Sequence, residues 1–252
     1  MIETEIQLET SDGQLDAFVC HPEEDGPHPA VIFYMDAPAI REELRDMVRR
    51  LASAGYYVML PNLYYRIGTE GNYGYDLSRL REDPAEHQKM SAAMATLSNA
   101  RIVEDTAFLL AHLRCDPAAN DASLGCVGYC MSGPFVISVC AAYPADFSAG
   151  ASYHGVKMVT DKPDSPHLCI PAIKAEIYIG FAENDTLVDK SDWQVLADGL
   201  SDAEVTHRVE IYPEVGHGFV FPQRAFYERA AAERHWERLH ALFHRRLDSS
   251  SS

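Results

Sequence analysis

The sequence of 252 residues is poor in positive charge, with 21 lysines and arginines against 38 aspartates and glutamates and a formal net charge of −17. A surface this acidic repels nucleic-acid backbones and anionic lipid headgroups, so we expect neither nucleic acid nor a membrane as a partner. No apolar run approaches the roughly 18 residues of a membrane span. The N-terminus lacks the basic and apolar regions of a signal peptide, so we expect a cytoplasmic protein.

Paired ligand motifs are also missing. The six cysteines include no CxxC pair, and the segments "HGVKM" and "HRVE" lack the ligand spacing of zinc sites. No Gly-rich phosphate-binding loop is present. We therefore expect no metal and no organic cofactor. We expect the cysteines to be free thiols, most of them packed as small hydrophobic residues.

Strand-like and helix-like segments alternate along the chain. Residues 30–35 form a continuous apolar run, which is typical of a strand buried on both faces. Residues 41–55 place apolar side chains at helical spacing, and the alternation continues to a long helical segment at 224–247. This pattern predicts an α/β fold with a mostly parallel central sheet and helices on both faces.

The domain organisation follows from the absence of internal repeats and linkers. We expect residues 1–248 to form a single domain and residues 249–252 to be a polar tail. The least regular part is 62–90, which is rich in tyrosine, glycine and charge. A long insertion of this kind either shapes a binding site or is a plain surface excursion, and the sequence supports both interpretations equally.

The stretch "GCVGYCMSGPF" places Cys130 at a junction between an apolar strand and an apolar helix. Gly128 precedes it by two residues, and a sharp strand-to-helix turn of this kind presents a nucleophile where only small neighbours fit. The usual pattern is Gly-x-Ser-x-Gly, whereas here Ser132 stands in the last position and Gly133 follows it. The start of the helix favours a thiolate, and the Met131 N–H is a candidate oxyanion donor.

Ser132 is the alternative nucleophile. If the turn were centred on Ser132, Cys130 and Pro134 would stand where the turn requires glycine. The pattern therefore favours Cys130.

A candidate acid and a candidate base follow the cysteine in chain order. Asp185 lies in the loop after one apolar strand, and His217 lies between two glycines after the next strand. Functional loops follow the carboxyl ends of parallel strands, where we expect the three side chains to meet. Either residue alone could be only a turn or loop residue, but three candidates in this order predict a Cys-His-Asp triad.

The segments "GYCMSG", "AENDTLVD" and "YPEVGHGF" resemble the cysteine, acid and histidine loops of the dienelactone hydrolase family, which has the α/β-hydrolase fold. The likeness covers nearly the whole chain. It implies a hydrolase that cleaves a small ester or lactone through a thioester on the cysteine. It also implies that Asp36, standing where the family has a glutamate, contacts the resting cysteine. Ala37 would then supply the second oxyanion N–H.

The resemblance is weaker for the substrate pocket. The family's dienelactone enzymes hold a substrate carboxylate with a serine directly after the histidine and an arginine three residues further on, and Gly218 and Phe221 occupy those positions here. Arg66, Arg79 and Arg81 are possible replacements, with surface solvation as the favoured role of each. We expect a small-molecule ester or lactone as the partner and a monomer or homodimer. The candidate pocket residues, for which packing or solvation is the alternative role, are Tyr64, Tyr65, Arg66, Tyr153, His154 and Phe219.

A different class of function also fits a reactive cysteine. Cys130 could be a redox sensor or could hold a ligand on the same scaffold without hydrolysis. A redox sensor would need a resolving cysteine nearby. Cys126 is close in sequence but lies in the preceding strand, where its side chain should point away from the turn.

Overall fold

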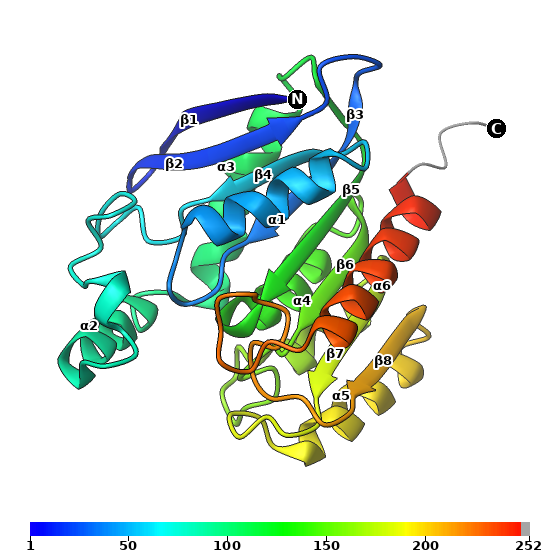
Figure 1. Ribbon diagram of the computed structural model, residues 1–252. Helices are drawn as coiled ribbons and strands as arrows, with labels where there is room; N and C mark the ends of the chain where they lie inside the picture. Colours follow the sequence, from blue (N-terminus) through cyan, green and yellow to red (C-terminus); the bar gives the residue numbers. More distant parts are fainter. Residues whose placement is uncertain (248–252) are drawn as a thin grey trace.

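The computed structural model describes residues 1–247, and its strands form one eight-stranded sheet in the order β1-β2-β4-β3-β5-β6-β7-β8 (Figure 1). The first two strands form an antiparallel hairpin, and β2 also pairs antiparallel with β4, whereas all other neighbours are parallel. Residue 248 and the expected tail at 249–252 lie outside the described residues. The strands are β1 (Ile2–Thr10), β2 (Gly13–His21), β3 (His28–Tyr34), β4 (Tyr57–Pro61), β5 (Ala119–Tyr129), β6 (Phe147–Tyr153), β7 (Glu176–Ala182) and β8 (His207–Tyr212).

Helices cover both faces of the sheet. Figure 1 shows α1 and α6 on one face and α3, α4 and α5 on the other, as their contacts with the strands also indicate. The predicted α/β fold with a mostly parallel sheet is therefore confirmed. None of the described helices is long and apolar enough to cross a bilayer. The α-helices are α1 (Glu42–Ala52), α2 (Pro84–Met94), α3 (Asn99–Leu113), α4 (Gly133–Ala142), α5 (Lys190–Asp202) and α6 (Arg229–Leu247); short 3₁₀ helices are η1 (Leu77–Arg79), η2 (Cys130–Ser132) and η3 (Pro166–Ala172).

Helix α4 occupies the centre of one helical layer. Its sequence, GPFVISVCAA, is apolar all round, as expected for a helix enclosed on every side. It packs against β5 and β6 of the sheet and against α3 and η3. The start of α4 is therefore fixed relative to the carboxyl end of β5.

The turn between β5 and α4 has room only for glycine at two positions. A Cβ atom on Gly128 would lie 2.4 Å from the carbonyl oxygen of Ser132, and one on Gly133 would lie 2.4 Å from Cα of Gly155. Contacts this short with backbone atoms cannot be relieved by a side-chain rotation. The sequence-based expectation that this junction excludes larger residues is confirmed at both glycines.

We expect the substitution Gly133→Ala to lower the free energy of unfolding by about 3 kcal/mol, the upper end of the usual cost of overpacking, because its methyl group meets backbone. A suitable control is Gly199→Ala in helix α5, where the added Cβ makes only a 3.4 Å contact with Ile170. That change should raise stability by about 0.5–1 kcal/mol, as alanine does inside helices. Urea unfolding measures both, and equal stability of the Gly133→Ala protein and the wild type would contradict the geometry.

The insertion at 62–90 is more regular than its composition predicts. Helix α2 begins at Pro84, where Asp83 caps it by accepting a hydrogen bond from the Ala85 N–H. The expectation of irregular structure up to residue 90 is therefore wrong at its end, because a proline at the first turn and an aspartate cap start a helix even in a polar stretch. The aromatic part stays near the sheet, where Tyr73 packs edge-on against Tyr64.

Candidate active site

Cys130 lies at the carboxyl end of β5 with a backbone conformation unusual for its type. Its φ is 56°, in the left-handed region that non-glycine residues rarely adopt. Strain of this kind persists where the surrounding structure enforces it, and it is concentrated at functional sites. The half-buried thiol thus stands on a sharp turn directly before α4.

Asp185 and His217 meet although they are far apart in sequence. Asp185 follows β7 and His217 follows β8, and Oδ2 of Asp185 accepts a hydrogen bond from Nδ1 of His217 at 2.7 Å. The other carboxylate oxygen, Oδ1, accepts from the Leu187 N–H at 2.9 Å. Both side chains are shielded, with exposures of 1% for Asp185 and 19% for His217. The aspartate therefore fixes the orientation of the imidazole.

The electrostatic surroundings of His217 favour its charged form. Burial acts to lower the pKa of His217, but the hydrogen bond to Asp185 and the sulfur of Cys130 outweigh it and raise that pKa to about 10. Nε2 of His217 is buried and has no hydrogen-bond partner among the described residues. This nitrogen is thus the one left to exchange a proton with Cys130.

Tyr64 connects the two residues expected to supply oxyanion donors. Its hydroxyl donates to the carbonyl oxygen of Ala37 at 3.0 Å and approaches Sδ of Met131 at 3.2 Å. Ala37 follows β3 and Met131 follows Cys130, so Tyr64 holds the two loops together. Ser132, by contrast, is fully buried, and its hydroxyl donates to the Met35 carbonyl. A buried, bonded hydroxyl does not fit the alternative in which Ser132 is the nucleophile.

Asp36 makes contacts that the sequence did not indicate. Its Oδ2 accepts from Arg41 at 3.1 Å and from Arg224 at 3.3 Å, and its Oδ1 is also paired with Arg41. No hydrogen bond joins Asp36 to Cys130 within residues 1–247. The structure thus pairs this carboxylate with two arginines, and its expected contact with the thiol stays a prediction. Sequence reasoning missed both arginines, because neither stands at a position where the family pattern has one.

His154 is a buried histidine directly beside His217. The two ring centroids are 4.8 Å apart, and neither ring nitrogen of His154 has a hydrogen-bond partner among the described residues. Burial, followed by repulsion from His217, holds the pKa of His154 well below its usual range. His154 is therefore neutral and adds no second positive charge next to His217.

The other candidate pocket residues are distributed between the site and the core. Phe219 is fully buried and packs near His154, with ring centroids 5.9 Å apart. The hydroxyl of Tyr153 donates to the carbonyl oxygen of His235, inside the core. Tyr65 and Arg66 both bind Asp105 of α3. For Tyr65 and Arg66 the structure supports a structural role, because their polar groups are already paired.

The chain matches the family model described as the dienelactone hydrolase family over residues 15–247. Among the curated relatives, a "Putative carboxymethylenebutenolidase" of Synechocystis sp. is 25% identical over 252 residues, covering 97% of this chain and 97% of that protein. A protein of the same description from Methylorubrum extorquens is 27% identical, covering 96% of this chain and 81% of the relative.

The fold has similar solved structures. The "Putative Dienelactone Hydrolase from Klebsiella pneumoniae" aligns with a TM-score of 0.83 at 23% identity, covering 96% of this chain and 98% of the other. The "Dienelactone Hydrolase-like Promiscuous Phospotriesterase P91", from metagenomic libraries, aligns with a TM-score of 0.73 at 17% identity, covering 97% and 99%. The family match over nearly the whole chain, together with this fold, shows that the chain belongs to the dienelactone hydrolase family and is a carboxylic ester hydrolase with the α/β-hydrolase fold.

Proposed function

We propose that the protein cleaves a small ester or lactone with Cys130 as nucleophile, His217 as acid and base, and Asp185 as the residue that orients His217. The observation that carries this proposal is the 2.7 Å hydrogen bond between Asp185 and Nδ1 of His217. It leaves Nε2 of that ring to act on a thiol held at a strained strand-to-helix turn. The curated relatives described as carboxymethylenebutenolidases support the same class of substrate.

The reaction uses a proton that Nε2 of His217 takes from, or shares with, the sulfur of Cys130. The sulfur then attacks the carbonyl carbon, and the carbon–oxygen π electrons move to the oxygen, which the N–H groups of Met131 and Ala37 stabilise. When the tetrahedral intermediate collapses, the alcohol leaves with the proton from His217, and a thioester remains on Cys130. Water then gives a proton to His217 as it attacks the thioester, and release of the acid returns that proton to the sulfur.

The pKa of about 10 for His217 suits the first half of this cycle. At neutral pH the ring holds a proton, which is the one that the leaving alcohol receives.

Detecting a covalent intermediate on Cys130 is the most direct test of this mechanism. We expect rapid mixing with p-nitrophenyl acetate followed by acid quench to leave one acetyl group on the peptide that contains Cys130, detected by mass spectrometry and removed by hydroxylamine. Alkylating the thiol with iodoacetamide beforehand should prevent both labelling and turnover. Acetyl groups found on another residue during turnover would contradict the mechanism.

The non-hydrolytic alternative predicts a different result. A redox sensor would react with peroxide and form a disulfide with a resolving cysteine, without ester turnover. Cys126 and Cys140 lie with their sulfurs 3.6 Å apart, and both are fully buried, so Cys126 is directed toward the core and not toward the turn. This arrangement favours hydrolysis over redox sensing for Cys130.

A further inference from the structure

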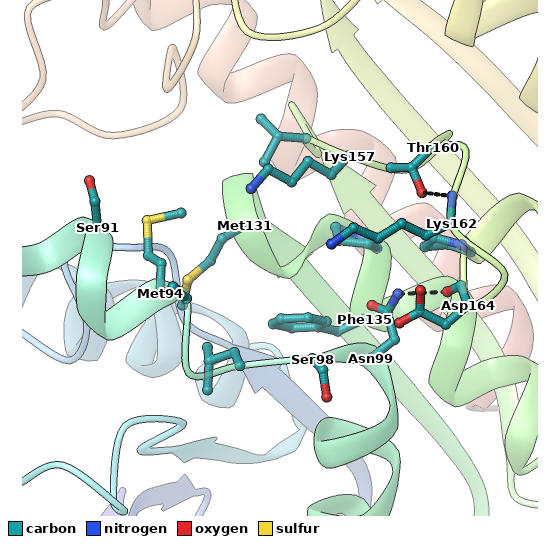
Figure 2. A pocket seen from close by; sticks show the side chains of 15 residues that line it. Ser91, Met94, Ser98, Asn99, Met131, Phe135, Lys157, Thr160, Lys162 and Asp164 are labelled. Atoms are coloured by element: carbon teal, nitrogen blue, oxygen red, sulfur yellow. Dashed lines mark hydrogen bonds between the residues drawn. The ribbon is translucent and has the colours of Figure 1, made fainter.

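A cavity of about 670 Å³ begins beside the nucleophile (Figure 2). Its lining runs from Met131 and Phe135, at the start of α4, to the end of α2 and to the loop after β6. Val156 lies on this lining, and its N–H donates to the carbonyl oxygen of Cys130 at 3.1 Å. The cavity is therefore anchored at one end to the residue that would carry the acyl group.

The inner part of the cavity is apolar. Met94 and Leu97, from α2 and the segment after it, line the cavity together with Met131 and Phe135, and Figure 2 shows Met94 beside Met131. Its volume falls within the roughly 300–1,000 Å³ of sites that bind drug-sized ligands, which is more than a single five-membered lactone requires. The cavity suits an extended apolar group.

Two lysines line the cavity from the loop after β6. Lys157 and Lys162, from the loop after β6, extend toward Met131 in Figure 2 and form no ion pair with any described residue. The cavity lining contains one carboxylate, that of Asp164, so its charged groups sum to a positive value. Two exposed, unpaired cations here contrast with the chain's net charge of −17.

The geometry of the proposed reaction decides which half of the ester enters the cavity. The leaving alcohol must receive a proton from His217, so it lies on the side of the histidine loop. Residues of that loop do not line the cavity, whereas Met131, whose N–H would hold the carbonyl oxygen, does. The chain attached to the carbonyl carbon therefore points from Cys130 along Met131 and over Phe135.

On the basis of the proposed function, we propose that this cavity binds an apolar acyl chain and that Lys157 and Lys162 bind a carboxylate at the free end of that chain. The substrate class is then the monoesters of dicarboxylic acids with an apolar chain between the two acid groups. After cleavage the acyl group stays on Cys130, so the same contacts act during hydrolysis of the thioester. Because the lysines are exposed, their effect is sensitive to salt.

The test compares mono-p-nitrophenyl suberate with p-nitrophenyl octanoate, which has the same chain length and no terminal carboxylate. We expect kcat/KM to be about tenfold higher for the suberate ester, the size of effect that two exposed ion contacts provide. The double variant Lys157→Gln/Lys162→Gln should lose this preference and keep its activity on the octanoate. The matched control is Lys174→Gln/Lys190→Gln, which removes two exposed lysines that do not line the cavity and should keep the preference.

A second variant tests the apolar part. Ala95 is exposed at the cavity rim, and Ala95→Phe would narrow it, so hydrolysis of both long esters should fall relative to p-nitrophenyl acetate. Suppose that acetate hydrolysis requires Cys130. If the suberate ester is then not preferred over the octanoate, or if the Lys157→Gln/Lys162→Gln variant still prefers it, the cavity assignment is wrong and the catalytic proposal stands. If acetate hydrolysis does not require Cys130, the catalytic proposal itself fails.

Discussion

Replacing Cys130 with alanine should reduce kcat for p-nitrophenyl acetate by about a thousandfold or more, because it removes the proposed nucleophile. His217 and the oxyanion donors would remain, and such groups alone give only a small residual rate. The fold should be retained, since alanine is smaller than cysteine and its side chain is only half-buried here. Initial rates, together with circular dichroism, measure the two effects separately.

Cys115→Ala is the matched control for this substitution. Cys115 is exposed in the segment after α3, so its removal deletes a thiol without touching the site. It should leave kcat unchanged. A folded Cys130→Ala protein with wild-type turnover would show that the sulfur does not attack the ester.

The second large effect is expected for Asp185→Asn, which should lower kcat/KM by about a thousandfold because the amide no longer stabilises the imidazolium or fixes its tautomer. The pH profile should change as well. In the wild type the pKa of His217 is raised to about 10, so activity that depends on imidazolium should persist at alkaline pH and fall only as the pH passes that value. Removing the carboxylate lowers that pKa, so the alkaline limb should move to lower pH.

The pH dependence of the free energy of unfolding measures the raised pKa of His217 independently of activity. A histidine whose pKa is raised in the folded state stabilises the fold fully below its unfolded pKa of roughly 6.5 and loses that contribution as the pH rises through the folded value. Wild-type unfolding free energy should therefore fall between pH 6.5 and about pH 10, and less so in Asp185→Asn. Identical pH profiles for the two proteins, in activity and in stability, would contradict the role of Asp185.

Asp189→Asn serves as the control for the aspartate substitution. Asp189 caps α5 by accepting from the Ser191 N–H at 2.9 Å, and asparagine caps helices equally well. This variant changes the same charge in the same loop without reaching His217. Its pH profile should match that of the wild type.

The sequence predicts part of the site because it predicts the parallel strands that carry the site residues. Apolar runs and helical spacing predict parallel strands, and side chains that follow such strands gather at one edge, which is where Asp185 and His217 meet. The contacts of Asp36 could not be predicted, because Arg224 comes from a loop far along the chain and nothing marks Arg41 as turning back toward β3. The burial of His154, whose ring nitrogens have no hydrogen-bond partner within residues 1–247, could not be predicted either, since no sequence pattern marks such a histidine.

The positive φ of Cys130 lowers the stability of the folded protein, because a residue with a Cβ atom is strained at that angle. Glycine adopts that backbone angle without a steric penalty, so we expect a folded protein with glycine at this position to be more stable than one with cysteine. The substitution Cys130→Gly should therefore melt at a higher temperature than the natural protein while turning over no ester. If Cys130 is the nucleophile, the thiol at this position supplies reactivity at the expense of stability.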